Sequence, residues 1–165
     1  MTDALPSAKE HIDAALQLCA KIDDLPADTP LIQIAKVGVI GAGTMGGGIT
    51  MNFLSAGIPV TIVEQEQAAL DRGVAVMAKN YEASVKRGRI EAADAEAAMA
   101  RLTPSLSFDD LADCDLVIEA VYETMEVKKD VFGRLDKIVK QGAILASNTS
   151  SLDIDEIATA TTRPE

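Results

Sequence analysis

From about residue 34 onward, short apolar runs alternate with longer amphipathic stretches. The apolar runs are of strand length and lie at 36–40, 59–63, 116–120 and 143–146. Apolar residues recur at helical spacing at 44–56, 67–86, 91–101, 127–139 and 153–160. Strands that alternate with helices favour parallel pairing through right-handed crossovers. The pattern therefore predicts an α/β fold built on a doubly wound parallel sheet.

The first 30 residues follow a different pattern. Ser7 and Glu10 have the spacing of a capping box, in which a hydroxyl and a carboxylate each accept from a backbone amide at a helix start. Helical spacing of apolar residues continues to Ile22, and the stretch 23–30, rich in Asp and Pro, predicts a linker. We expect a helical appendage with its linker over residues 1–30 and an α/β domain over residues 31–165. The apolar stripe of the appendage requires a partner surface, on that domain or elsewhere.

Charge and composition limit the choice of partner. The net charge of −11 and the lack of a Lys/Arg stripe make nucleic acid and an anionic membrane poor partners, because both require a concentrated positive surface. No apolar run reaches the roughly 18 residues that a membrane span needs. Cys19 and Cys114 form no CxxC pair and no signal peptide is visible, so we expect two reduced thiols and a cytoplasmic protein.

Three glycines after the first predicted strand carry the strongest chemical signal. Gly41, Gly43 and Gly46 fit the pattern G-x-G-x-x-G between a predicted strand and a predicted helix. The first glycine permits a tight turn, the second lets the backbone approach a pyrophosphate, and the third lets the helix pack closely on the strand. Unpaired amides at the start of the helix can bind that anionic group. This arrangement predicts a Rossmann-type dinucleotide-binding domain.

An acidic residue supports the same interpretation. Glu64 ends the second predicted strand, 18 residues after Gly46, where a carboxylate accepts hydrogen bonds from the adenosine ribose hydroxyls. Because a carboxylate there repels a 2′-phosphate, the sequence favours NAD over NADP. The alternative is a purely structural glycine turn, but strand, glycines, helix, strand and acid follow one another in the order that dinucleotide binding requires.

Three blocks of sequence stand out beyond this general pattern. They are 41–49 (GAGTMGGGI), 117–123 (VIEAVYE) and 147–152 (SNTSSL). Together they resemble the NAD-binding domain of 3-hydroxyacyl-CoA dehydrogenases, most closely the version within multifunctional fatty acid β-oxidation enzymes. The resemblance runs from about residue 34 to the last residue, and its third block is the most specific. It implies oxidation of L-3-hydroxyacyl-CoA to 3-oxoacyl-CoA with transfer of a hydride to NAD.

The resemblance also assigns roles to single residues. The cofactor contacts that it implies are Gly41, Gly43, Thr44, Met45, Gly46, Glu64, Gln65, Val121, Tyr122, Glu123, Lys128 and Ser150. Ser150 matches the catalytic-site serine that hydrogen-bonds near the substrate oxygen and the nicotinamide. Asn80 and Arg87 lie where the family contacts coenzyme A. Arg87 has other basic residues beside it, so it fits an ordinary solvated helix end equally well.

The family's catalytic base follows the last element predicted here. In the family a His, oriented by a Glu, removes the hydroxyl proton, whereas this sequence ends at Glu165 before that position. Hydride transfer requires a base within hydrogen-bond reach of the hydroxyl. His11, the single histidine, lies in the appendage, and we expect it to be a solvated surface residue. We therefore expect a domain that is incomplete at its C-terminal end, binds NAD and has little or no turnover alone.

Several partners are implied by the resemblance. They are an acyl-CoA substrate, the family's C-terminal helical domain and, in the multifunctional enzymes, a hydratase domain upstream. Self-association through a bare strand edge is also open. Two alternative functions remain: an NAD-binding module without catalysis, and another β-hydroxyacid dehydrogenase of the 6-phosphogluconate or hydroxyisobutyrate kind. The block 147–152 argues against the second alternative.

The remaining polar residues predict no further site. An acidic cluster lacks calcium-loop spacing, so we expect a solvated turn and no metal. Its members are Asp109, Asp110, Asp113 and Asp115. The serines of 147–151 have no histidine partner and no G-x-S-x-G turn, which argues against acyl transfer, and Ser151 is expected to help cap the helix near residue 153. Met51 and Met77 fit the core-facing sides of their helices.

Overall fold

The computed structural model describes residues 7–19, 26, 28–29 and 31–164. The chain divides into two compact units, Met1–Ile32 and Gln33–Glu165. Within the described residues, no helix is long and apolar enough to cross a membrane. Both cysteines are free thiols, with Cys19 exposed and Cys114 buried.

Helix α1 (Ala8–Cys19) belongs to the first unit. It begins with the predicted capping box: the Ser7 amide donates to Glu10 Oε2 at 2.8 Å, and the Glu10 amide donates to Ser7 Oγ at 3.3 Å. None of its side chains is buried, and His11 is exposed, as expected. The predicted last turn of this helix at 20–22 and most of the predicted linker lie outside the described residues.

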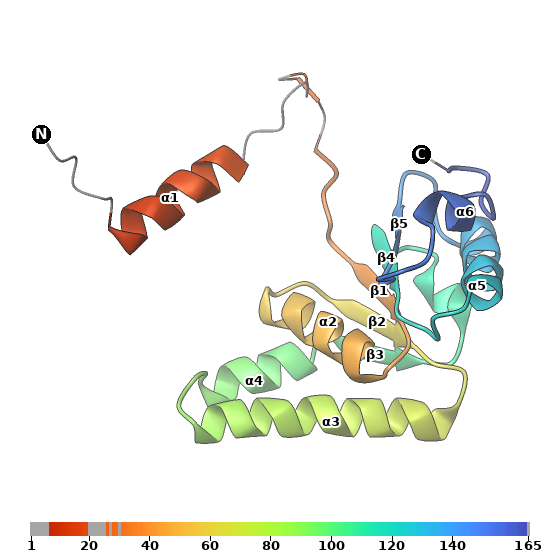
Figure 1. Ribbon diagram of the computed structural model, residues 1–165. Helices are drawn as coiled ribbons and strands as arrows, with labels where there is room; N and C mark the ends of the chain where they lie inside the picture. The colour runs from red at the N-terminus through yellow and green to blue at the C-terminus, as the bar shows by residue number, and fades with distance from the viewer. Residues whose placement is uncertain (1–6, 20–25, 27, 30, 165) are drawn as a thin grey trace, which may run out of the picture. The chain divides into compact units, whose positions relative to one another are not determined.

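The second unit is built on a five-stranded parallel sheet with the strand order β3-β2-β1-β4-β5. The strands are β1 (Val37–Ile40), β2 (Val60–Val63), β3 (Leu102–Ser105), β4 (Leu116–Glu119) and β5 (Ile144–Ser147). The chain runs from β1 through β2 to β3 and then crosses to the other side of β1 to form β4, so the strand order reverses between β1 and β4 (Figure 1). The predicted doubly wound α/β fold is confirmed.

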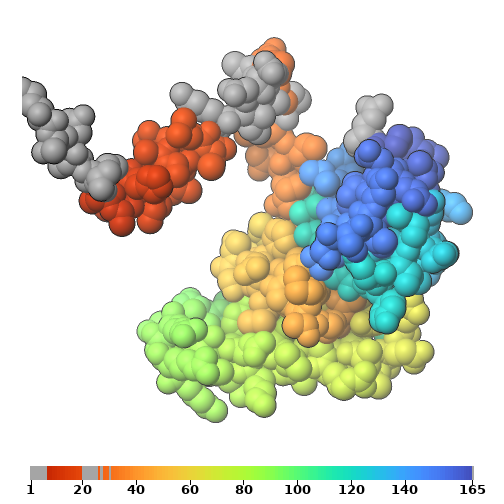
Figure 2. All heavy atoms as spheres, viewed as in Figure 1, coloured from red at the N-terminus to blue at the C-terminus, as the bar shows by residue number. Residues whose placement is uncertain are grey.

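Helices cover both faces of this sheet. One layer contains α2 (Thr44–Ser55), α3 (Gln67–Lys86) and α4 (Ala92–Met99), and the other contains the 3-10 helix η1 (Phe108–Leu111), α5 (Met125–Ile138) and α6 (Ile154–Ala158). The first layer is orange to green and the second is mainly cyan to blue in Figure 2. Successive residues of β1 serve the two layers, since Val39 packs into the core cluster of the first and Ile40 into that of the second.

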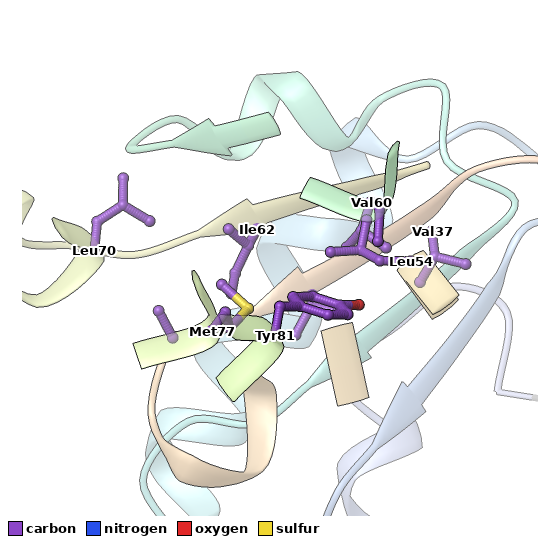
Figure 3. Packing of buried hydrophobic residues seen from close by; sticks show 10 residues of the cluster. Val37, Leu54, Val60, Ile62, Leu70, Met77 and Tyr81 are labelled. Atoms are coloured by element: carbon purple, nitrogen blue, oxygen red, sulfur yellow. The ribbon is translucent and has the colours of Figure 1, made fainter. Parts of the chain in front are cut away.

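The core cluster of the first layer fixes the helix that follows the glycine turn. Met77 and Tyr81 of α3 are almost fully buried in it (Figure 3), and Met51 of α2 packs against it, so the predicted core positions of both methionines are confirmed. The Tyr81 hydroxyl donates to the Met51 carbonyl at 3.1 Å and lies 3.0 Å from Ser55 Oγ. These contacts hold α3 against α2.

Strand β3 was not among the predicted strands. The segment Leu102–Ser105 is short and contains Pro104, which lacks the amide donor that an interior strand requires. Its place at the edge of the sheet removes that requirement, because Pro104 has a neighbouring strand on one side only, at Ile62.

The predicted cap of α6 was wrong. The N-cap is Asp153, whose Oδ1 accepts from the amides of Asp155 at 2.9 Å and Glu156 at 3.3 Å. Ser151 lies two residues earlier, and its own amide donates to Thr149 Oγ1 at 3.4 Å. An aspartate at the cap position therefore replaces the predicted serine cap.

The acidic cluster is more ordered than the predicted solvated turn. Asp115 accepts from the Lys140 ammonium at 2.5 Å and from the amides of Ala35 and Lys36 at 2.8 and 2.9 Å. The bond from Lys140, followed by those two amides, lowers the pKa of Asp115 to about 2. Asp113 forms an ion pair with Lys36 at 2.6 Å. These aspartates tie the start of β1 to the start of β4, and the described residues contain no group of acids, histidines and cysteines suited to a metal.

Candidate dinucleotide-binding site

A cleft of 640 Å³ opens beside the carboxyl ends of β1, β2 and β4, where the strand order reverses. In doubly wound sheets a ligand binds at this reversal point. The cleft brings together the predicted cofactor residues Gly41, Gly43, Thr44, Met45, Glu64, Gln65, Val121 and Tyr122. Its apolar lining includes Ile40, Val63, Phe108, Ala120 and Val127. Segments far apart in the sequence therefore share one cleft.

Two glycines of the fingerprint have the structural roles predicted for them. Gly41 has a φ of 98°, and a Cβ on it would lie 2.6 Å from the Ala120 carbonyl oxygen. A Cβ on Gly46 would lie 1.8 Å from the Gly41 carbonyl oxygen, so no side chain fits between α2 and the turn. The turn is also bound to the next strand, because the Gly41 amide donates to the Val63 carbonyl at 2.8 Å.

Gly43 has the opposite surroundings. Its backbone is extended, and a Cβ on it would meet no atom within 4 Å. It is the N-cap of α2, and among the described residues no side chain caps the amides at that end. Since Gly43, Thr44 and Met45 all line the cleft, the turn is a cradle that a side chain at position 43 would fill. This geometry fits the diphosphate of a dinucleotide, which such amides and the positive end of the helix dipole bind.

Glu64 stands beside this cradle at the end of β2. Its Oε1 accepts from the Ala42 amide at 2.9 Å, and its Oε2 accepts from the Gln65 amide at 3.0 Å. A carboxylate oxygen has two acceptor positions, so both oxygens retain capacity for ribose hydroxyls. The bond to Ala42 also means that the carboxylate helps to hold the glycine turn, which the spacing alone did not indicate.

The opposite wall rests on a buried ion pair. Lys128 of α5 and Glu119 of β4 both have side chains that are 0% exposed, and the Lys128 ammonium lies 2.9 Å from each Glu119 oxygen. The resemblance implies that Lys128 contacts the cofactor, yet its ammonium is enclosed by carboxylates, including Glu123 Oε2 at 3.0 Å. Glu119 was not predicted as a site residue. Its sequence signal was an acid at the end of an apolar strand.

Glu123 connects this pair to the segment that follows β5. Its Oε1 accepts from the Thr149 hydroxyl and from the Ser150 amide, the latter at 3.1 Å. The hydrogen bond from Thr149 is the largest cause that lowers the pKa of Glu123 to about 2, followed by the bond from Lys128. Glu123, Lys128 and Ser150 thus form one polar cluster beside the cleft, and Ser150 is exposed.

The predicted coenzyme A residues are separated from this cluster. Asn80 borders a second cleft of 560 Å³, which shares Gly43, Thr44 and Glu64 with the first. Arg87 is the exposed C-cap residue of α3 and lines neither cleft.

A parallel sheet whose order reverses at a cleft bordered by this glycine turn defines a Rossmann-type dinucleotide-binding domain. Among known families, the model of the 3-hydroxyacyl-CoA dehydrogenase, NAD binding domain matches residues 36–165. The chain belongs to this family, which confirms the predicted resemblance, and NAD is the family's cofactor.

Individual relatives agree with this assignment. The chain is 43% identical over 130 residues to a 3-hydroxybutyryl-CoA dehydrogenase of Clostridioides difficile, a match that covers 79% of this chain and 46% of that protein. It is 41% identical over 132 residues to a peroxisomal bifunctional enzyme of Cavia porcellus, covering 80% of this chain and 18% of that protein. The chain thus spans about half the length, or less, of the curated relatives that it matches.

Solved structures give the same result. The crystal structure of 3-hydroxybutyryl-CoA dehydrogenase from Escherichia coli matches with a TM-score of 0.79 and 37% identity, covering 81% of this chain and 28% of that chain.

Proposed function

We propose that this chain binds NAD in the 640 Å³ cleft and forms the cofactor-binding part of an enzyme that oxidises L-3-hydroxyacyl-CoA to 3-oxoacyl-CoA. The observation that carries the proposal is the open cradle at Gly43, with an uncapped helix on one side and the Glu64 carboxylate on the other. Its relatives support the acyl-CoA substrate, since both 3-hydroxybutyryl-CoA dehydrogenases and bifunctional enzymes match at similar identity.

In this proposal the cleft orients the cofactor along the sheet edge. Glu64, with Gln65 beside it, holds the adenosine ribose, and the amides of Gly43, Thr44 and Met45 hold the diphosphate. The nicotinamide end then lies across the reversal point, toward the residues that follow β4 and β5. When bound there, NAD supplies the hydride acceptor.

The residues after β4 and β5 complete the proposed site. Val121 and Tyr122 line the cleft, while Glu123 fixes the backbone of Ser150. The exposed Ser150 hydroxyl donates to the substrate oxygen and so orients it. His11, the single histidine of the sequence, is an exposed residue of the first unit, so the proposal assigns the base to no residue of this sequence.

The finer features of the proposal concern substrate and setting. Asn80 and Arg87 contact coenzyme A, and the reaction belongs to fatty acid β-oxidation in the cytoplasm. A helical substrate domain and, in a multifunctional arrangement, a hydratase domain are the partners. Bifunctional relatives support the last point, as does the fatty acid oxidation complex subunit alpha of Psychrobacter cryohalolentis, which is 39% identical over 132 residues.

NADH titration with a Gly43→Val variant tests the proposal. The extended backbone accepts valine and no atom lies within 4 Å of its Cβ, so the fold is kept while the cradle is filled. We expect the affinity for NADH, measured from the fluorescence enhancement of the bound cofactor, to fall at least about tenfold. The reason is that the diphosphate loses charge-assisted hydrogen bonds. Gly48→Ala, an equally open glycine on α2, is the matched control. Equal NADH affinity of Gly43→Val and wild type would refute the assigned cleft.

A second candidate, an NAD-binding module without catalysis, shares the background turnover expected of this chain and differs only in whether a further segment supplies the base. Reduction of acetoacetyl-CoA by NADH measures the turnover of the chain itself, and we expect a rate at background because the proposed base is supplied elsewhere. Robust turnover would show that the base was assigned wrongly.

A further inference from the structure

The buried carboxylate of Glu119 makes more contacts than an ion pair requires. Its Oε1 accepts from the Val121 amide at 2.7 Å, and its Oε2 accepts from the Ser147 hydroxyl at 2.7 Å. Each oxygen also lies 2.9 Å from the Lys128 ammonium. All four acceptor positions of the carboxylate are therefore used, which leaves none for a ligand.

These contacts reach every segment that borders the proposed nicotinamide end. Val121 belongs to the segment after β4 and lines the cleft, and Ser147 is the last residue of β5, paired with Glu119 across the sheet. Lys128 passes the constraint on to Glu123 at 3.0 Å, and Glu123 holds the Ser150 amide at 3.1 Å. One carboxylate thus sets the positions of groups on β4, β5 and α5.

Stability alone does not account for such a pair. Burying two charges carries a larger desolvation cost than forming an ion pair at the surface. Apolar residues of similar volume often give a core the same stability as a buried ion pair, or more. A buried pair with every bond satisfied does, however, fix one geometry, since each group that it binds has a single favourable position.

We propose that Glu119 is a positioning residue for the nicotinamide half of the cofactor, acting through the Val121 amide, Ser147 and the Lys128–Glu123–Ser150 chain. This inference rests on the proposed function, because it requires NAD in the cleft. It assigns Lys128 an indirect role in which its charge acts on the cofactor site through Glu123. Among the described residues, the hydrogen bonds and ion pair of the Glu119 side chain go to Val121, Ser147 and Lys128, and none joins it to the glycine turn or Glu64, which hold the proposed adenosine half.

The test compares NADH with ADP, which carries only the adenosine and diphosphate groups. In Glu119→Gln we expect NADH affinity to fall about tenfold or more, since bonds involving a charged group are lost. ADP affinity, measured by calorimetry, is expected to stay within about twofold. Asp113→Asn, which removes the same charge from the pair with Lys36 at the opposite end of the sheet, is expected to change neither affinity.

The outcomes separate the inference from the proposed function. Equal loss of NADH and ADP affinity in Glu119→Gln, or no loss of either, would overturn the positioning role. The proposed function would stand in that case, provided that the wild-type chain binds NADH. A wild-type chain that binds neither ligand would overturn the proposed function and this inference with it. If Glu119→Gln does not fold, Ser147→Ala removes one neutral donor from the same carboxylate. A severalfold loss of NADH affinity with ADP unchanged is then expected, and unchanged NADH affinity would overturn the role.

Discussion

Replacing Lys128 with methionine measures the energetic cost of breaking the buried pair with Glu119, together with the loss of the Lys128 bond to Glu123 at 3.0 Å. The methionine has nearly the volume of the lysine stem, so the substitution removes the charge with little change in packing. Glu119 is left 0% exposed with only the Val121 amide and the Ser147 hydroxyl as donors. Breaking a buried pair by removing one partner costs about 3–5 kcal/mol.

That cost is large relative to the stability of a domain of this size. Domains of this kind are stable by about 5–15 kcal/mol, so Lys128→Met is expected to remove about a fifth or more of the free energy of unfolding. The melting temperature should fall by on the order of 10–20 °C. Lys36→Met breaks a pair whose side chains are 31% and 71% exposed, and its cost is expected to be about 0–1 kcal/mol.

Urea unfolding of wild type, Lys128→Met and Lys36→Met provides the measurement. A double variant, Glu119→Met with Lys128→Met, is expected to recover part of the lost stability, because no buried charge remains unpaired while the Val121 amide and the Ser147 hydroxyl lose their acceptor. Equal destabilisation by the two single lysine substitutions would refute the argument, since it would show that burial of the Glu119–Lys128 pair has no energetic consequence.

Other predictions test the turn, the acid and the aspartate that ties two strands. Gly46→Ala is expected to destabilise the fold by about 1–3 kcal/mol or more, because the added Cβ would lie 1.8 Å from the Gly41 carbonyl oxygen. Gly48→Ala, at an open position of the same helix, is expected to stabilise it by about 0.5–1 kcal/mol. Thermal melts of the two variants distinguish these effects. Glu64→Ser is expected to lower NADH affinity about tenfold and to narrow the preference for NADH over NADPH, which competitive titration measures; an unchanged preference would contradict the role of the carboxylate. Asp115 has a folded pKa of about 2, below its unfolded value of about 3.9, so its contribution to stability is complete above the unfolded pKa and is lost as the pH falls through 2. Asp115→Asn should therefore lose less stability than wild type between about pH 4 and pH 2, and parallel pH profiles in urea unfolding would exclude this contribution.

The parts of the fold that were predicted have strong local signals. Helix α3 runs from Gln67 to Lys86, as its long apolar periodicity predicted. The fingerprint joins β1 to the first turn of α2, because strand, turn and helix start are adjacent in sequence. Strand β3 has no such signal. Its four residues, LTPS, include a proline and few apolar side chains, and only its place beside β2 makes it a strand.

In the candidate site, too, the residues with a strong local sequence signal were predicted and the others were not. The glycine turn and Glu64 were predicted because their spacing is fixed by consecutive elements. The contacts of Glu119 with Lys128 and Ser147 join residues 9 and 28 positions apart, which a linear pattern does not encode. A signal for Lys128 was nevertheless present, because it occupies the helical spacing of the buried residues Val131, Phe132 and Leu135 on α5. A lysine at a core position of an amphipathic helix requires a buried acid, and Glu119 is the acid at the end of the neighbouring apolar strand.

The position of that pair also explains how the two halves of the cleft differ. On the proposed adenosine side, the shape is set by backbone that cannot vary: the turn at Gly41 admits no side chain, and the Gly41 amide is bound to β2. The other side has no such constraint from the backbone. Its two segments, after β4 and after β5, are far apart in the sequence and contain exposed residues such as Tyr122 and Ser150. Ordering mobile groups during binding costs affinity, so a site that must hold a ring in one orientation gains from segments fixed beforehand. A saturated charge pair at the junction of β4, β5 and α5 supplies that constraint through side chains, in the half of the cleft where glycines do not.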